Sequence, residues 1–68
     1  MEVTIRDDFI KLGQVLKLAS VVQDGVEAKY VIQEGKVKVN GEVDLRRGRK
    51  IYPGDVVSFG DAEIIVTR

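Results

Sequence analysis

The stretch IQEGKVKVNG, residues 32–41, marks the point where the chain changes from helical to extended structure. Gly35 is the residue type that most often ends a helix in the left-handed conformation. After it, residues 36–39 (KVKV) alternate between polar and apolar with the period of a half-buried strand. Asn40-Gly41 is the strongest short signal for a tight hairpin turn. The stretch therefore predicts the end of a helix, then a strand, then a hairpin.

Two amphipathic helices are predicted before this stretch. Apolar residues recur at helical spacing from Leu12, and Gly13 weakens that helix by about 1 kcal/mol relative to Ala. We interpret Gly13 as a site of close packing against a neighbour. Asp24 and Glu27 have the spacing of a capping box, which predicts a second helix over residues 25–34. The residues predicted to face inward are Leu12, Val15, Leu16 and Ala19 in the first helix and Ala28, Val31 and Ile32 in the second.

Short strands are predicted on both sides of the helix pair. Residues 3–5 form the first, and a strand after Gly41 completes the hairpin. Pro53-Gly54-Asp55 suits a type II turn, after which Val56, Val57 and Phe59 form a strand that leads to a second hairpin turn at Gly60-Asp61. A final strand follows over residues 62–67. The order β-α-α-β-β-β-β predicts one α+β domain over residues 1–68, with two short helices packed on a small antiparallel β-sheet.

Positive charge is concentrated in one part of a chain whose formal net charge is zero. Residues 29–50 hold seven of the eleven Lys and Arg residues and three acids, a net of +4, and the remainder has a net of −4. The densest part is RRGRK, residues 46–50. Cations this crowded repel one another, and a polyanion would relieve that repulsion. Nucleic acid is therefore the predicted class of partner.

The composition argues against most kinds of active site. The chain has no Cys and no His, which removes thiolate chemistry, the commonest general base and the commonest transition-metal ligand. No glycine-rich phosphate-loop motif occurs. We interpret Asp7-Asp8 as a helix cap rather than as a site for a hard cation. The sequence thus predicts a protein that is not an enzyme and has no cofactor, metal or catalytic residue.

No apolar run approaches the roughly 20 residues that a membrane-spanning helix needs. The first residues, MEVTIRDD, lack the basic and apolar regions of a signal peptide. We therefore expect a cytoplasmic protein without a membrane partner.

The basic cluster at residues 46–50 is open to two interpretations. A run of charge is often only a solvated face. However, three of its four cations are Arg, whose planar guanidinium binds phosphate through two hydrogen bonds and also stacks on bases. Tyr30 and Tyr52 are either base contacts or boundary packing, whereas Phe9 and Phe59 are assigned to the core.

The motifs resemble those of a known family. Residues 12–19 (LGQVLKLA), 27–29 (EAK), 32–41 and 53–55 (PGD) are similar to the S4-type RNA-binding domain. That pattern has two helices, I-x-x-G-x-V-x-V-N-G, a variable loop, and P-G-D before a strand. The match covers Lys11 to Phe59, and the basic loop and short length resemble the small, stand-alone YaaA/YbcJ-like branch.

This resemblance implies an α-L motif, in which the helix pair and an adjoining strand form a surface for structured RNA, above all ribosomal RNA. Many family members have Arg at the start of the first helix and Ser-Arg at the second, where this chain has Lys11 and Asp24-Gly25. We therefore expect the loop and strand cations to dominate. The predicted RNA-binding residues are Arg46, Arg47, Arg49, Lys50, Lys36, Lys38 and Lys29, with Lys11 and Lys17 from the first helix.

Our leading hypothesis is a monomeric, non-catalytic RNA-binding protein that binds structured ribosomal RNA in ribosome association or assembly. Two alternatives stay open. The basic face could meet an acidic protein partner, and phosphate contacts alone do not separate RNA from DNA.

Overall fold

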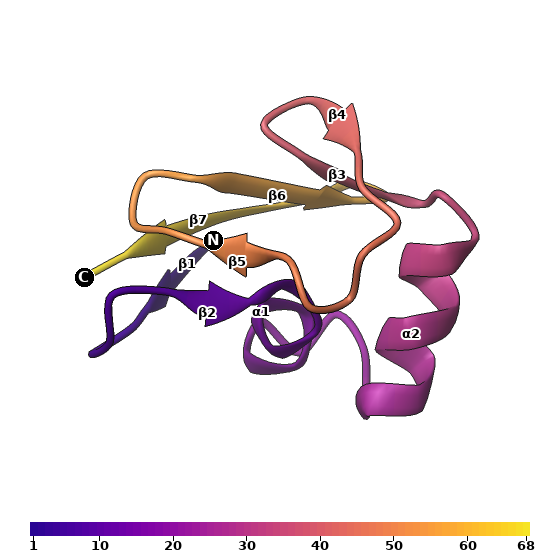
Figure 1. Ribbon diagram of the computed structural model, residues 1–68, viewed down its shortest axis with the longest axis horizontal. Helices are drawn as coiled ribbons and strands as arrows, with labels where there is room; N and C mark the ends of the chain where they lie inside the picture. Colours follow the sequence, from indigo (N-terminus) through magenta and orange to yellow (C-terminus); the bar gives the residue numbers. More distant parts are fainter.

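The computed structural model describes residues 1–68, which form two helices and seven strands (Figure 1). In chain order the elements are β1 (Glu2–Thr4), β2 (Ile10–Lys11), α1 (Leu12–Leu18), α2 (Gly25–Gln33), β3 (Val37–Val39), β4 (Glu42–Val43), β5 (Lys50–Ile51), β6 (Val56–Phe59) and β7 (Ala62–Thr67). The α+β class and the two short helices packed on a sheet are confirmed. None of the helices is long and apolar enough to cross a membrane.

The main sheet is mixed, whereas the sequence predicted an antiparallel one. Its five strands lie in the order β1-β7-β6-β3-β4, and all neighbours are antiparallel except β1 and β7, which run parallel. Val3 pairs with Val66, and both side chains are buried. A parallel pair needs a long connection, and here the whole intervening chain supplies it. Nothing local in residues 3–5 could signal that partner.

Two strands were not predicted. β2 and β5 pair antiparallel as a separate two-stranded sheet, with Ile10 opposite Ile51 and Lys11 opposite Lys50. Each has two residues, which is too few to show an alternating pattern. Ile51 is fully buried, so this small sheet ties the basic loop to the core.

The end of α2 and its start follow the predicted pattern. Asp24 accepts a hydrogen bond from the Glu27 backbone amide at 2.9 Å, and Gly35 has the left-handed φ of 76° that ends the helix. The Glu27 carboxylate accepts from the Gln23 amide rather than from that of Asp24.

The interpretation of Asp7-Asp8 as a helix cap is wrong. Strand β2 lies between this pair and α1, whose N-cap residue is Lys11. Asp8 instead pairs with Arg68 at 3.0 Å. Two adjacent acids can cap only the helix that begins directly after them, and residues 9–11, which include the unpredicted strand β2, separate Asp8 from the start of α1 at Leu12.

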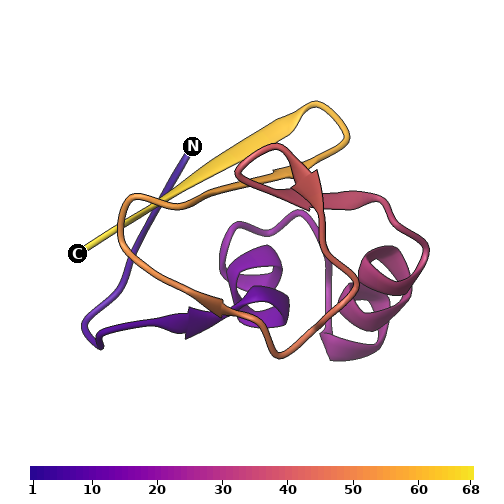
Figure 2. The same cartoon turned by 45° about the horizontal axis from the view of Figure 1, so that its top comes forward.

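Sixteen apolar residues form one core between the helices and one face of the main sheet. Leu12, Val15, Leu16, Ala28 and Ile32 come from the helices, and all are fully buried. Phe59 packs against this core, as predicted, whereas Phe9 lies outside it. Residues 44–50 run beside both helices on the way to β5 (Figure 2). The loop with the highest positive charge therefore lies against the helix pair.

Candidate nucleic-acid interface

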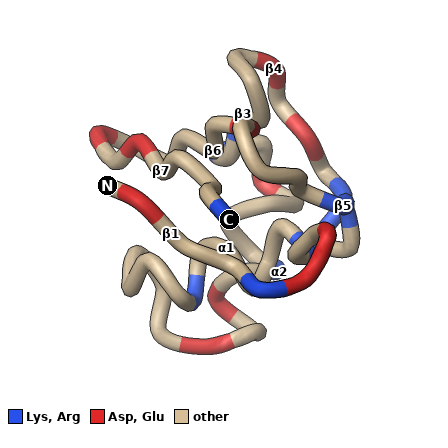
Figure 3. Tube along the Cα trace, turned by 90° about the vertical axis from the view of Figure 1, so that its left-hand side faces the viewer, with Lys and Arg blue, Asp and Glu red and all other residues tan.

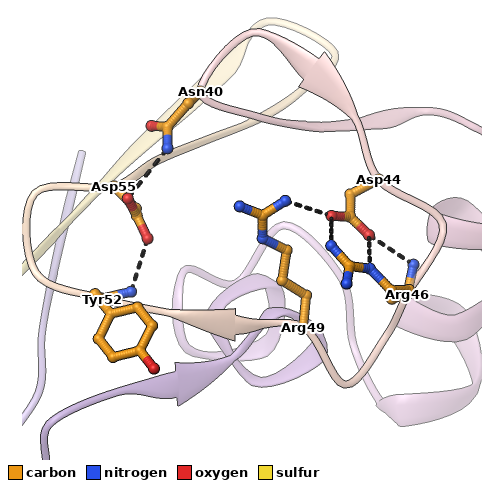
Figure 4. Close-up of polar contacts among 6 residues, drawn as sticks. All are labelled: Asn40, Asp44, Arg46, Arg49, Tyr52 and Asp55. Carbon is orange, nitrogen blue, oxygen red and sulfur yellow. Dashed lines mark hydrogen bonds and ion pairs between the residues drawn. The ribbon is translucent and has the colours of Figure 1, made fainter.

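The basic loop, which contains the cluster at residues 46–50, is held by a buried carboxylate. Asp44 is only 6% exposed and accepts hydrogen bonds from two arginines. Arg46 donates Nε to Oδ1 at 3.1 Å and Nη2 to Oδ2 at 2.9 Å, and its backbone amide also donates to Oδ1 at 2.9 Å. Arg49 donates Nη1 to Oδ2 at 2.6 Å from the other side (Figure 4). We call Asp44, Arg46 and Arg49 the Asp44 clasp.

The clasp keeps Asp44 ionised. Hydrogen bonds from the Arg46 side chain hold the pKa of the Asp44 carboxyl well below its usual range. Burial acts in the opposite direction, and the bond from Arg49 again lowers the pKa. The same contact raises the pKa of Arg46. One negative charge thus compensates part of the positive charge of the loop and fixes its shape.

Backbone contacts attach the loop to α1. The Leu12 amide donates to the Arg49 carbonyl at 2.9 Å, and the Gly13 amide donates to the Arg47 carbonyl at 3.1 Å. Free amides at a helix start can bind an anion, but the loop occupies these two. Phosphate contacts at this end of α1 therefore fall to side chains.

Gly13 allows the loop to come this close, which confirms the predicted close packing. A Cβ atom at Gly13 would lie 2.8 Å from Cγ of Arg47, inside the normal contact distance. The neighbour that sequence reasoning left unnamed is thus one of the predicted RNA-binding residues.

Lys50 extends the basic surface from the loop to β2. It lies directly opposite Lys11 in the β2-β5 pair, where two like charges destabilise each other. The Lys50 ammonium lies 4.9 Å from the ring centroid of Phe9, a cation–π contact that offsets part of this repulsion. Phe9 therefore supports a cation rather than filling the core.

Three neighbouring hollows follow the loop and the helices. Cations, glycines and a few other side chains line them, and none has an Asp or Glu in its wall. The inter-helix pocket, of about 270 Å³, is lined by Lys11, Gly13, Gln14, Lys17, Gly25, Ala28, Arg47 and Gly48. The loop pocket, of about 620 Å³, is lined by Arg46, Gly48, Arg49 and Lys50. The α2 pocket, of about 580 Å³, is lined by Gly25, Val26, Lys29, Tyr30, Gln33 and Arg47.

Arg47 joins these hollows into one surface, because it lines both the inter-helix pocket and the α2 pocket. Gly48 in turn lines the inter-helix pocket and the loop pocket. We call the three pockets together the basic surface. A fourth hollow, of about 430 Å³, lies on the side of α1 that faces residues 4–10, and Asp7 is in its wall.

The structure brings seven of the nine predicted site residues to the basic surface. Figure 3 shows several of the Lys and Arg positions close together near β5. The seven are Lys11, Lys17, Lys29, Arg46, Arg47, Arg49 and Lys50. Lys36 and Lys38 line none of the three pockets. Val37 and Val39 are buried and Lys38 is exposed between them, so Lys38 points away from the core, as the alternation predicted. The helix cations thus line pockets that the loop cations also line, whereas the strand cations do not.

The two most specific sequence motifs are bonded to each other. The Asn40 side-chain amide donates to Oδ1 of Asp55 at 3.1 Å (Figure 4). The Val56 backbone amide donates to Oδ1 of Asn40 at 2.9 Å. The other carboxylate oxygen of Asp55 accepts from the Tyr52 amide at 2.8 Å. These contacts bring the two ends of the segment between Asn40 and Asp55 together, and this segment contains the basic loop.

The chain belongs to the S4 domain family. The family's sequence pattern matches residues 3–67. The "Probable ribosome maturation protein RlbA" of Bacillus subtilis (strain 168) is 48% identical, and the match covers 93% of each chain. The "Putative RNA-binding protein YbcJ" of Escherichia coli (strain K12) is 40% identical over 84% of this chain and 81% of the relative.

A solved structure supports the same assignment. The solution structure of YbcJ from E. coli, described as having an αL motif involved in RNA binding, matches with a TM-score of 0.76. The identity in that comparison is 34%, covering 98% of this chain and 86% of the other. The predicted resemblance to the S4-type domain and its small YbcJ-like branch is therefore confirmed.

Sequence reasoning missed the role of Asp44. In the charge count for residues 29–50, Asp44 was only one of three acids beside seven cations. A signal was present, because an acid two and five residues before arginines in a turn-rich segment can accept from both. The burial of that acid, however, depends on tertiary packing.

Proposed function

We propose that this protein is a non-catalytic RNA-binding protein that binds structured RNA, above all ribosomal RNA, through the basic surface. The RNA phosphates contact Arg47 and Lys50 of the loop together with Lys11, Lys17 and Lys29. Arg46 and Arg49 keep the loop in shape through Asp44 and offer their remaining donors to phosphate. Phosphate contacts position a protein without reading sequence, so recognition follows the shape of a stem or junction.

The observation that carries this proposal is the position of Arg47. It lines both pockets that lie between the helices and the loop, and neither these pockets nor the adjoining loop pocket has an acid in its wall. A cation in a hollow without neighbouring acids strengthens the local positive potential and attracts a polyanion. The opposed Lys11 and Lys50 would gain from the same neutralisation.

A place in ribosome maturation is proposed from the similarity to the B. subtilis relative, whose name assigns it that role. The E. coli relative supports RNA as the partner. Co-sedimentation with assembling subunits, compared with mature ones, tests this part of the proposal. Equal absence from both would contradict a ribosomal role and leave RNA binding open.

Fluorescence anisotropy tests RNA binding directly. A structured ribosomal-RNA fragment and a DNA hairpin of the same stem are titrated across a salt series. If four to six phosphates are neutralised, log K falls with log salt at a slope of about −3 to −5. The test variant is Arg47→Glu with Lys50→Glu, since neither residue bonds to Asp44 and the clasp stays intact.

The matched control reverses two cations away from the basic surface, Lys36→Glu with Lys38→Glu. The net charge change is the same, so only position differs. We expect the Arg47/Lys50 variant to lose RNA binding at least 30-fold and the control to lose less than about 5-fold. Equal losses would contradict the basic surface as the site. Absence of RNA binding at low salt would contradict the function and favour an acidic protein partner, whereas equal binding of the DNA hairpin would contradict the preference for RNA.

A further inference from the structure

The α2 pocket differs from the other two hollows because it has an aromatic side chain in its wall. Tyr30 and Val26 lie one turn apart on α2, and they are 64% and 65% exposed. Lys29, Gln33 and Arg47 complete the pocket around them. An exposed apolar residue alone is ordinary. Here an exposed ring shares a hollow with two cations and an amide.

The two tyrosines of the chain are in different situations. The Tyr52 ring packs against Phe9 with a centroid distance of 6.0 Å, whereas no aromatic partner lies beside Tyr30. Glu27 of α2 and Glu34, the residue directly after α2, are also engaged elsewhere. Glu27 accepts from the Gln23 amide at 2.7 Å, and Glu34 lies 3.9 Å from the Lys36 ammonium. The α2 pocket therefore keeps its positive charge and a free ring face.

We propose that the α2 pocket binds one unpaired nucleotide of the RNA, with its base stacked on Tyr30. The adjoining phosphate contacts Arg47 and Lys29, and the Gln33 amide faces an edge of the base. Each base has a π face that an aromatic ring can cover, and an amide can both donate to and accept from a base edge. The volume of about 580 Å³ holds a nucleotide.

The ligand is therefore a stem with an extruded or flanking unpaired nucleotide, rather than a continuous duplex. A base inside an A-form helix has both faces stacked, and only an unpaired base can present a face to Tyr30. This inference rests on the proposed function, because it needs the same RNA to lie on the basic surface. Arg47 links the proposed nucleotide site to the rest of the basic surface, since it lines both the α2 pocket and the inter-helix pocket.

Two RNA hairpins with the same stem test the proposal. The stem of one is fully paired and the stem of the other carries a single bulged 2-aminopurine, and both have the same loop. We expect wild type to bind the bulged hairpin about 5- to 100-fold more tightly, the range that one base–aromatic stack gives. Tyr30→Ala should remove this preference, so that the variant binds the two hairpins equally. Tyr30→Phe should retain the preference, and the 2-aminopurine emission should change on binding wild type and not Tyr30→Ala.

Tyr52→Ala is the matched control, and circular dichroism checks that each variant folds. A preference for the bulge that survives Tyr30→Ala would overturn the proposal, as would equal binding of both hairpins by wild type. If wild type binds both hairpins equally and Arg47→Glu abolishes binding to each, the proposed function is supported and the nucleotide site is contradicted. If wild type binds neither hairpin, the proposed function and the nucleotide site are both contradicted.

Discussion

Two parts of the chain carry clustered positive charge and are built in opposite ways. In the basic loop each cation has a structural contact. Arg46 and Arg49 bond to Asp44, Arg47 packs on Gly13, and Lys50 lies over Phe9. On strand β3, by contrast, Lys38 projects into solvent from a strand that the core already holds.

The difference shows that charge density alone does not define a binding surface. Lys36 and Lys38 raise the positive charge of their segment, yet they line none of the pockets where the helices and the loop meet. The loop cations lose side-chain conformational freedom through these contacts, and Asp44 compensates part of their charge. In return they are held in place before the ligand arrives, which lowers the entropy lost on binding.

The largest effect is expected from removing both cations that hold Asp44. Arg46→Gln with Arg49→Gln leaves a buried carboxylate without a charged partner, which costs about 3 kcal/mol or more of folding free energy. Urea unfolding measures the loss. Lys36→Gln with Lys38→Gln is the matched control, and its surface substitutions should change stability by less than about 0.5 kcal/mol. Similar losses in both variants would show that the clasp adds no stability.

A smaller effect is expected from acid. The pKa of Asp44 is lower in the folded chain than in the unfolded chain, so its ionised form contributes stability at neutral pH. That contribution is lost as the pH falls below about 4, the usual pKa of Asp, towards the lower folded value. By pH 3, wild type should lose about 1 kcal/mol more, relative to pH 7, than Asp44→Asn does. Urea titrations of both chains at the two pH values check this, and parallel pH profiles would contradict it.

The smallest change in stability is expected from Gly13→Ala. Alanine favours the helix by about 1 kcal/mol, but its Cβ atom would meet Cγ of Arg47 at 2.8 Å. The two effects should nearly cancel in thermal unfolding. RNA affinity should nevertheless fall severalfold, because Arg47 must move. Gly25→Ala is the control for a methyl group in the same pocket that displaces no side chain, since a Cβ there has no atom within 4 Å. Unchanged RNA affinity in Gly13→Ala would show that the position of Arg47 is not critical.

The parts of the fold that local patterns specify were predictable. The stripe from Leu12, the Asp24 cap, the Gly35 stop and the turn at Asn40-Gly41 all depend on residues close together in the chain. The parallel partner of β1 and the two-residue strands β2 and β5 were not, because their pairing depends on residues about 40 or more positions away.

The residues of the candidate site also divide into features that local patterns predict and features that depend on tertiary packing. Composition identified the cations, and alternation correctly turned Lys38 outward. The clasp could not be foreseen, because it requires Asp44 to be buried by the final packing. The sequence could not show that Tyr52 packs on an aromatic ring and Tyr30 does not, because this difference depends on the position of Phe9 in the folded chain.

The parallel pairing of β1 with β7 has a consequence for the order in which the chain can fold during synthesis. Val3 and Ile5 are made before both helices, yet the residues that they pair with or donate to, Val66 and Thr67, are made after both helices and the other strands of the sheet. Both helices can form early, because their contacts are local. The first strand must wait with its apolar side chains uncovered until the last strand has left the exit tunnel. Closure of the core is therefore a late event, and a nascent chain stalled before β7 would expose Val3 and Ile5 to solvent or to a chaperone.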